Sequence, residues 1–144
     1  MSTILVDEII SQSAGPVTIN DNLIVTGTNN IRPYKVYTAL LAQQNPTDNP
    51  QSEVLENTLG VTITWTRLGV GDYIATASAP VFTAFKTAVF SQVSANLGAT
   101  FPTQIIAGRQ STTIVSVLTV KTNSSSTPID AAFGLTPIEI RVYP

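Results

Sequence analysis

The chain is rich in side chains that branch at Cβ. Thr (21), Val (14) and Ile (14) together make up 49 of its 144 residues. Branching at Cβ restricts rotamers in a helix and suits the pleated surface of a sheet. Nine Pro and eight Gly are spread along the chain, as expected for turns between many short strands. The sequence therefore predicts an all-β fold, and its length corresponds to one ordinary domain.

The first 31 residues differ from the remainder, because all ten aromatic residues follow Ile31. Residues 3–10 and 17–27 are strand-like pieces separated by turn residues, and they contain no aromatic residue that could anchor a core of their own. We expect residues 1–31 to form an extended arm that lies on other subunits, with a reach on the order of 90–100 Å. A disordered leader is the alternative, but such leaders are usually poor in Ile and Val. The arm residues expected to make contacts are Ile4, Val6, Ile9, Ile10, Val17, Ile19, Leu23 and Val25.

Residues 32–144 carry the aromatic residues and are expected to form the folded domain. The predicted strands are Tyr34–Gln44, Val61–Arg67, Tyr73–Ala79, Ala88–Ala95, Gln104–Ala107, Thr112–Thr122 and Ile138–Tyr143. In Val61–Thr66 the apolar residues alternate with Thr, which is typical of a half-buried antiparallel strand. Seven short strands separated by polar turns predict an antiparallel, jelly-roll-like β-sandwich.

Two segments of this domain carry more specific expectations. Ile114–Val120 is apolar on both faces and is expected to be a central strand or a contact between subunits. Pro80–Lys86 is expected to form a short helix, since Pro is tolerated in a first helical turn.

The composition excludes most catalytic chemistry. The chain has no His and no Cys, so it has no imidazole base, thiolate nucleophile, disulfide or zinc site of the usual kind. Only 16 residues are charged and the net charge is −2, which argues against nucleic-acid binding. No apolar run approaches the roughly 20 residues that a membrane-spanning helix needs, so we expect no membrane insertion.

The remaining candidate sites have simpler interpretations. Paired carboxylates for glycoside hydrolysis would have to come from Asp7/Glu8, Glu53/Glu56, Asp72, Asp130 and Glu139, and nothing in the sequence brings two together. Asp48, Asp72 and Asp130 lack the spacing of a calcium loop, and Gly69–Gly71 lacks the Lys and helix start of a phosphate loop. We therefore expect no enzyme activity, no catalytic residues, no metal and no cofactor.

An aromatic platform for sugars is a further possibility near the start of the domain. It would use Tyr34 and Tyr37 together with Lys35. Aromatic residues at the start of a strand are more often anchors of the core, and the sequence favours that interpretation.

Several motifs resemble a domain found in tail-fibre-like and other structural proteins of bacteriophages. They are the opening Tyr34–Leu41, the segment Val54–Gly60, the Trp65 strand, Gly71-Asp72-Tyr73 and the closing Ile138–Pro144. The beginning of the chain, Met1–Asp7 and Val17–Gly27, resembles the virion-attaching starts of phage fibre proteins.

This resemblance implies a virion structural protein made in the infected host cytoplasm. The implied subunit is part of a short fibre, spike or head appendage, in which residues 1–31 attach to other virion proteins and residues 32–144 form the outward β-domain. Phage fibres of this kind are generally homotrimers. The alternatives are a tail adhesin that binds host-surface glycans, through loops such as Asn45–Pro50 or Asn123–Pro128, and a capsid decoration protein.

Overall fold

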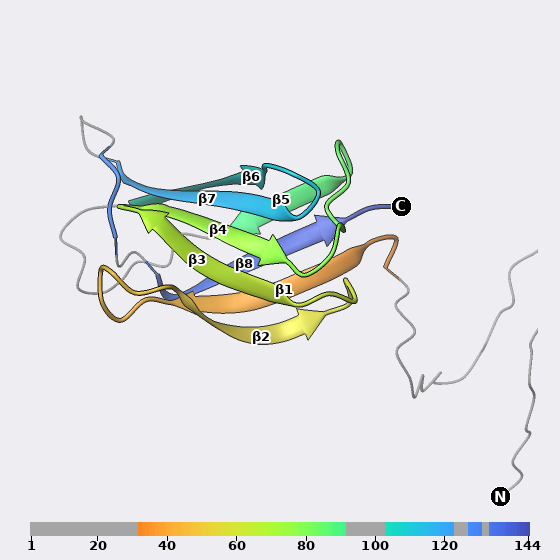
Figure 1. Ribbon diagram of the computed structural model, residues 1–144, viewed down its shortest axis with the longest axis horizontal. Coiled ribbons are helices and arrows are strands. Elements are labelled where there is room, and N and C mark those ends of the chain that lie inside the picture. Colours follow the sequence, from red (N-terminus) through yellow and green to blue (C-terminus); the bar gives the residue numbers. More distant parts are fainter. Residues whose placement is uncertain (1–31, 92–102, 123–126, 131–132) are drawn as a thin grey trace, which may run out of the picture.

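The structure is a computed structural model that describes residues 32–91, 103–122, 127–130 and 133–144. Eight strands and no helix occur in these ranges. The strands are β1 (Lys35–Ala42), β2 (Gln51–Asn57), β3 (Ile63–Gly69), β4 (Asp72–Ala77), β5 (Thr87–Ser91), β6 (Thr103–Arg109), β7 (Ile114–Lys121) and β8 (Gly134–Val142). They form two four-stranded sheets, ordered β2-β1-β8-β5 and β3-β4-β7-β6, in which every pair is antiparallel (Figure 1).

The predicted all-β fold and antiparallel β-sandwich are confirmed. The strand order differs from that of a jelly roll, in which successive strands alternate between the two sheets. Here β1 with β2, β3 with β4, and β6 with β7 are neighbours within one sheet. The short connections between these strands favour pairing within a sheet, so the sandwich is assembled largely from hairpins.

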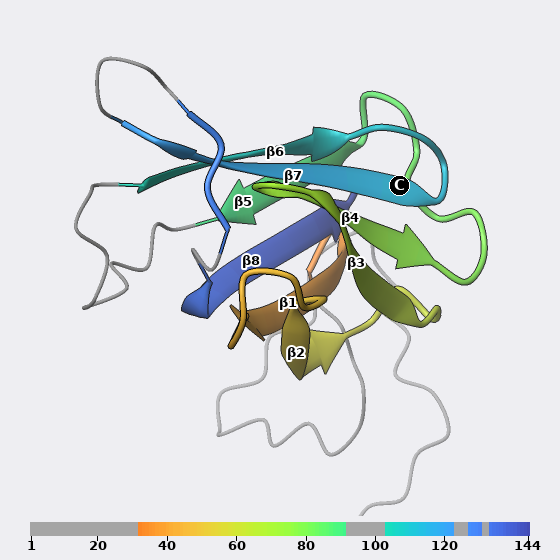
Figure 2. The same cartoon turned by 60° about the vertical axis from the view of Figure 1, so that its left-hand side comes forward.

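The core lies between the two sheets, which face each other in Figure 2. Alternation along the strands turns one side chain in two inward, as in β4, where buried and half-buried residues alternate throughout. The largest fully buried apolar side chains are Tyr37, Leu41, Tyr73, Phe82, Phe133, Ile138 and Ile140. The Trp65 indole N–H donates to the Tyr37 hydroxyl at 3.2 Å, which joins β3 of one sheet to β1 of the other.

The sandwich has two distinct ends. The first and last strands, β1 and β8, pair along their length from Lys35 opposite Val142 to Ala42 opposite Gly134. Antiparallel pairing therefore brings Arg32 and Pro144, the first and last described residues, to one end, together with residues 78–86 and 110–113 (Figure 1). We call this the termini end. The opposite end, which we call the hairpin end, carries residues 43–50, the β3–β4 turn and residues 127–130.

Comparison with the expected elements shows one strand missed and one helix wrongly assigned. Strand β2 was not among the predicted strands, because it is an edge strand whose residues are mostly exposed and follow no period of two. Residues 80–86 do not form a helix but lead into a turn closed by the Lys86 N–H and the Thr83 carbonyl. Ile114–Val120 lies in β7, a central strand as expected. The predicted end of the fourth strand, residues 92–95, and the arm, residues 1–31, lie outside the described residues.

Three glycines that flank β3, Gly60 before it and Gly69 and Gly71 at the β3–β4 turn, provide a graded test of this backbone. Gly71 has φ +67°, and an added Cβ would lie 2.5 Å from the Thr119 carbonyl oxygen and 2.7 Å from the Ile129 nitrogen. Gly60 has φ +76° with open space around it, and Gly69 has neither restriction.

We predict that Gly71→Ala lowers the free energy of unfolding by more than about 2 kcal/mol, Gly60→Ala by about 1 kcal/mol and Gly69→Ala by almost nothing. Urea denaturation of the three variants measures the order, and equal losses at Gly69 and Gly71 would contradict it.

Candidate functional site

An apolar groove lies at the termini end, where β1 begins and β8 ends. We call it the terminal groove, and its volume is about 610 Å³. Three segments that are distant in sequence form its walls, and the lining residues are Arg32, Pro33, Tyr34, Lys35, Pro80, Val81, Thr83, Val142, Tyr143 and Pro144. Seven of these ten residues are apolar, and the three prolines offer no backbone N–H donor. The groove is therefore suited to apolar side chains, with cationic groups on part of its wall.

Aromatic and ionic contacts fix one side of the terminal groove. The rings of Tyr34 and Tyr143 have centroids 5.2 Å apart and are tilted by 53°. The Arg141 guanidinium lies 4.7 Å from the centroid of the Tyr34 ring and 4.6 Å from that of Phe90, and it also pairs with the Glu139 carboxylate. A guanidinium held between two rings and a carboxylate loses little further freedom on binding, so this wall is already ordered.

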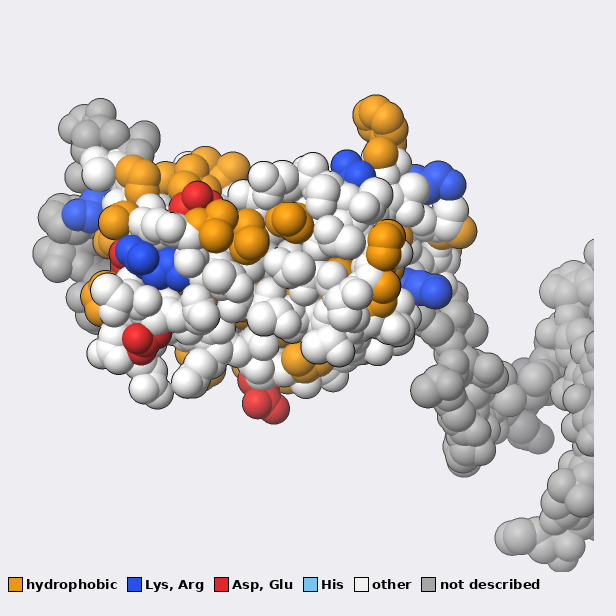
Figure 3. Space-filling model, viewed as in Figure 1, with side chains coloured by type: hydrophobic (Ala, Val, Ile, Leu, Met, Phe, Trp, Pro, Cys, Tyr) orange, Lys and Arg blue, Asp and Glu red, His pale blue; other side chains and the backbone are white. Residues whose placement is uncertain are grey.

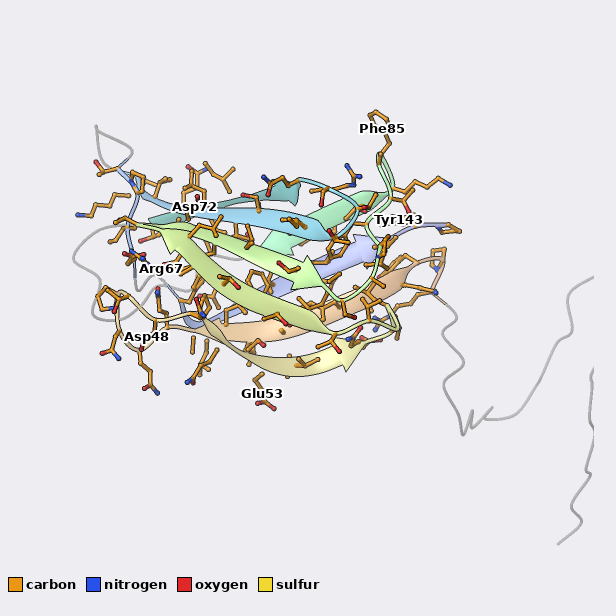
Figure 4. All side chains as sticks on the ribbon, in the orientation of Figure 1. Asp48, Glu53, Arg67, Asp72, Phe85 and Tyr143 are labelled. Carbon is orange, nitrogen blue, oxygen red and sulfur yellow. The ribbon has the colours of Figure 1, made fainter. Side chains whose placement is uncertain are left out.

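Phe85 projects from the termini end in a strained backbone conformation. It is the third residue of the Thr83–Lys86 turn, with φ 60°, a position that usually requires Gly. Its side chain is fully exposed and stands away from the sandwich (Figure 4). The left-handed conformation costs roughly 1–2 kcal/mol for such a residue. In the described fold Phe85 therefore combines backbone strain with an apolar side chain in water, and no burial offsets either.

Charge is distributed unequally between the two ends. Five of the seven Lys and Arg residues lie at the termini end, where they share the surface with two carboxylates, those of Glu56 and Glu139. The five are Arg32, Lys35, Lys86, Arg109 and Arg141. On the face shown in Figure 3, the charged side chains nearest that end are all basic, and the acidic ones lie toward the hairpin end and the lower edge. The termini end thus has a formal charge of +3.

A second candidate site, at the hairpin end, is centred on the carboxylate of Asp130. The Arg67 guanidinium donates to its two oxygens, from Nε at 3.0 Å and from Nη2 at 2.7 Å. The Gly71 N–H and the Tyr73 hydroxyl also point to Oδ1, at 2.9 and 3.0 Å. The Arg67 and Asp130 side chains are only 19% and 10% exposed, so this is a largely buried ion pair with bidentate geometry.

Strands and loops that are far apart in sequence converge on this carboxylate. The Tyr73 hydroxyl also lies 2.7 Å from the Gln43 Oε1, and the Gln43 amide group donates to the Asp48 carbonyl at 2.8 Å. The Arg67 backbone N–H donates to the Asn49 side chain at 2.9 Å. The network therefore connects residues 43–50, the β3–β4 turn and residues 127–130.

The protonation of this network follows from its contacts. The Arg67 hydrogen bond holds the pKa of Asp130 below its ordinary value, against the opposing effect of burial, and the Gly71 and Tyr73 hydrogen bonds act in the same direction as Arg67. Burial, followed by the hydrogen bond and the charge of Asp130, raises the pKa of the Tyr73 hydroxyl. Asp130 is therefore ionised and Tyr73 is neutral near pH 7, and the cluster supplies neither a general acid nor an activated nucleophile.

The structure separates the residues of the alternative sugar platform. Tyr37 is completely buried in the core, as expected for an anchor, whereas Tyr34 lines the terminal groove with Lys35. The ring that accompanies Tyr34 is that of Tyr143.

Most of the acidic candidates in the described residues are engaged in separate local contacts. In the described parts of the chain no group of three or more acidic residues could hold a metal ion. Asp48 closes a turn with Asn45, Glu56 pairs with Arg32, and Glu139 pairs with Arg141 on the outer face of β8. Glu53 points away from the body of the sandwich in Figure 4. Gly69–Gly71 forms the β3–β4 turn. Asp7, Glu8 and the predicted arm contacts lie outside the described residues, and these contacts are Ile4, Val6, Ile9, Ile10, Val17, Ile19, Leu23 and Val25.

Sequence reasoning did not anticipate the partners of Asp130 or the role of Arg67. These residues are 63 positions apart, and a single sequence carries no signal for such a pairing. A weak indication for Phe85 was available, because Thr83–Lys86 contains no Gly in a region that has to turn.

Comparisons with protein families, curated proteins and solved structures gave no match. The resemblance to phage structural proteins therefore stays a prediction based on sequence patterns. No helix long and apolar enough to cross a membrane was found in the described ranges.

The Asp130 network leads to a prediction about stability and pH. Asp130→Asn leaves the Arg67 guanidinium largely buried without its carboxylate, and we expect it to lower the free energy of unfolding by about 2–3 kcal/mol at pH 7. Because the pKa of Asp130 is depressed in the folded state, the wild-type advantage exists above the unfolded pKa of about 4. It is lost as the pH falls through the folded value.

The measurement is urea denaturation of both proteins at pH 7 and at pH 3. The difference between them should shrink in acid, and a difference that does not depend on pH would contradict the prediction. Glu53→Gln, on an exposed strand, is the matched control and should change stability by less than about 0.5 kcal/mol.

Proposed function

We propose that the chain is a structural component of a bacteriophage virion. In this proposal it is a short fibre, spike or appendage subunit, anchored to other virion proteins by residues 1–31. The observation that carries the proposal is Phe85, which is strained, fully exposed and located at the end of the sandwich where residue 32 begins the described domain. Strain and exposure that cost an isolated domain free energy are expected at a surface that another protein covers.

The chemistry of the described residues supports an assembly role. The best organised polar cluster is the Asp130 network, and both oxygens of its carboxylate accept hydrogen bonds from the protein itself. Such a cluster holds loops together and presents no group for reaction. Exposed apolar side chains occur at both ends and on the edge strand β2, including Leu55, Leu68 and Phe85. These surfaces suit packing between subunits, and a homotrimer is the assembly proposed here.

Phe85 and the arm provide separate tests of this role. Phe85→Gly removes the exposed ring and suits φ 60°, so the variant should fold with unchanged or slightly higher stability, by up to about 1 kcal/mol. We expect it to incorporate poorly into particles. A chain lacking residues 1–31 should keep the β-sheet circular dichroism spectrum and fail to join the particle.

Light scattering of the wild-type protein should give three times the 15.3 kDa of one chain. A wild-type monomer at micromolar concentration would contradict the trimer, and normal incorporation of the truncated chain would contradict the anchor. Leu68→Gly, which removes an exposed apolar side chain at the opposite end, is the control for Phe85→Gly.

Binding of host-surface glycans is a second candidate function, favoured by the position of the loops. Asn45–Pro50 and the described part of Asn123–Pro128 both lie at the hairpin end, opposite the proposed anchor. The Asp130 network fixes the residues beside both loops. Binding of the full-length protein to a glycan array, lost in a variant with Asn49→Ala and Asp48→Ala, would support an adhesin. An array without binding would favour a purely structural or capsid-decorating subunit.

A further inference from the structure

We propose that the terminal groove of one copy binds residues Ile4–Ile10 of a second copy. The inference rests on the proposed assembly role and specifies which surfaces meet. The groove is an apolar surface bounded by cations. Residues 1–31, which lie outside the described residues, are rich in aliphatic side chains and carry only acidic charges, so they are complementary to it.

Charge complementarity is the first argument. Residues 1–31 contain Asp7, Glu8 and Asp21 and no Lys or Arg, so their side chains have a formal charge of −3. The termini end has a formal charge of +3, whereas the hairpin end carries three Asp against Arg67 and Lys121. An acidic segment is therefore attracted to the end that contains the terminal groove and gains nothing at the other end.

The arrangement of residues within the segment is the second argument. In the segment Ile4–Ile10, the acidic residues Asp7 and Glu8 lie between aliphatic residues on both sides, Leu5-Val6 before them and Ile9-Ile10 after them. In the groove, Lys35 and Arg32 stand next to the apolar surfaces of Tyr34, Val81 and Val142. Aliphatic side chains on these surfaces, with the acids near Lys35, combine burial of apolar groups with charge attraction.

The length of the connecting chain allows the segment to reach a second copy. Residues 11–31 separate the Ile4–Ile10 segment from Arg32, which itself lines the groove. A stretch of this length spans roughly 25 Å as a random coil, about the diameter of a domain of this size. A flexible stretch of this length can therefore reach the groove of a neighbouring copy.

Cysteine cross-linking tests the proposal directly, because the natural chain contains no Cys. Ser11→Cys places a thiol next to the segment without changing its apolar or acidic residues. Thr83→Cys places one on the exposed rim of the groove, and Leu68→Cys is the matched control at the exposed hairpin end. Full-length chains carrying one thiol each, with only the Ser11→Cys chain tagged, are refolded together and oxidised.

We expect a tagged–untagged cross-linked dimer from Ser11→Cys with Thr83→Cys, at several times the yield obtained with Leu68→Cys. Adding Lys35→Glu to the Thr83→Cys chain should lower that yield up to about fivefold. Equal yields with Thr83→Cys and Leu68→Cys would overturn the proposal. A double variant, Ser11→Cys with Thr83→Cys, that cross-links only within one chain would also overturn it, because the segment would then occupy its own groove.

The cross-linking result can be distinguished from the tests of the proposed virion role. Incorporation into particles and the mass of the wild-type protein test the assembly role without reference to the groove. Loss of the specific cross-link with a normal trimer and normal incorporation would reject this docking site alone. A second thiol position, Thr3→Cys, covers the other side of the segment and guards against an unfavourable geometry at Ser11.

Discussion

The pairing of β1 with β8 is the contact on which the rest of the structure depends. It joins strands about 100 residues apart in the chain and forms the centre of one sheet, with β2 and β5 added on either side. The same pairing brings residues 32–35 next to residues 142–144, so it builds the wall of the terminal groove. Arg141 in β8 reaches both Tyr34, which directly precedes β1, and Phe90 in β5, because β1 and β5 pair with β8 on its two sides.

The two ends of the sandwich differ in how their charged and apolar side chains are stabilised. At the hairpin end a largely buried carboxylate is stabilised by a guanidinium, a backbone N–H and a phenol, and this arrangement ties three loops to the sheets. At the termini end, the walls are fixed by ring and ion-pair contacts, while Phe85 has no such support. The polar groups of the Asp130 network are paired within the protein, whereas at the termini end the Phe85 ring is left exposed.

Much of the fold could be predicted from the sequence, because the alternation of apolar and polar residues along a strand indicates which of its faces is buried. Val61–Thr66 and Ile138–Val142 alternate, and Ile63, Trp65, Ile138 and Ile140 are buried as that alternation requires. Alternation does not predict β2, because an exposed edge strand imposes no period on its sequence. Residues 80–86 form no helix, and Pro80 does not predict one, because proline is compatible with a turn as well as with a first helical turn. The candidate sites could not be predicted from the sequence in the same way. The Arg67–Asp130 pair and the terminal groove arise from contacts between distant segments, which propensity and alternation do not encode.

The hydrogen bond from Trp65 to Tyr37 has a practical consequence for observing this domain. Trp65 is the chain's single tryptophan, and it lies buried in the core with its indole directed from one sheet to the other. Its fluorescence therefore comes from one location and reports on whether the two layers remain in contact. Separation of the sheets exposes the ring to water and shifts its emission to longer wavelength. Spectroscopy can thus follow the opening of the sandwich without an added label.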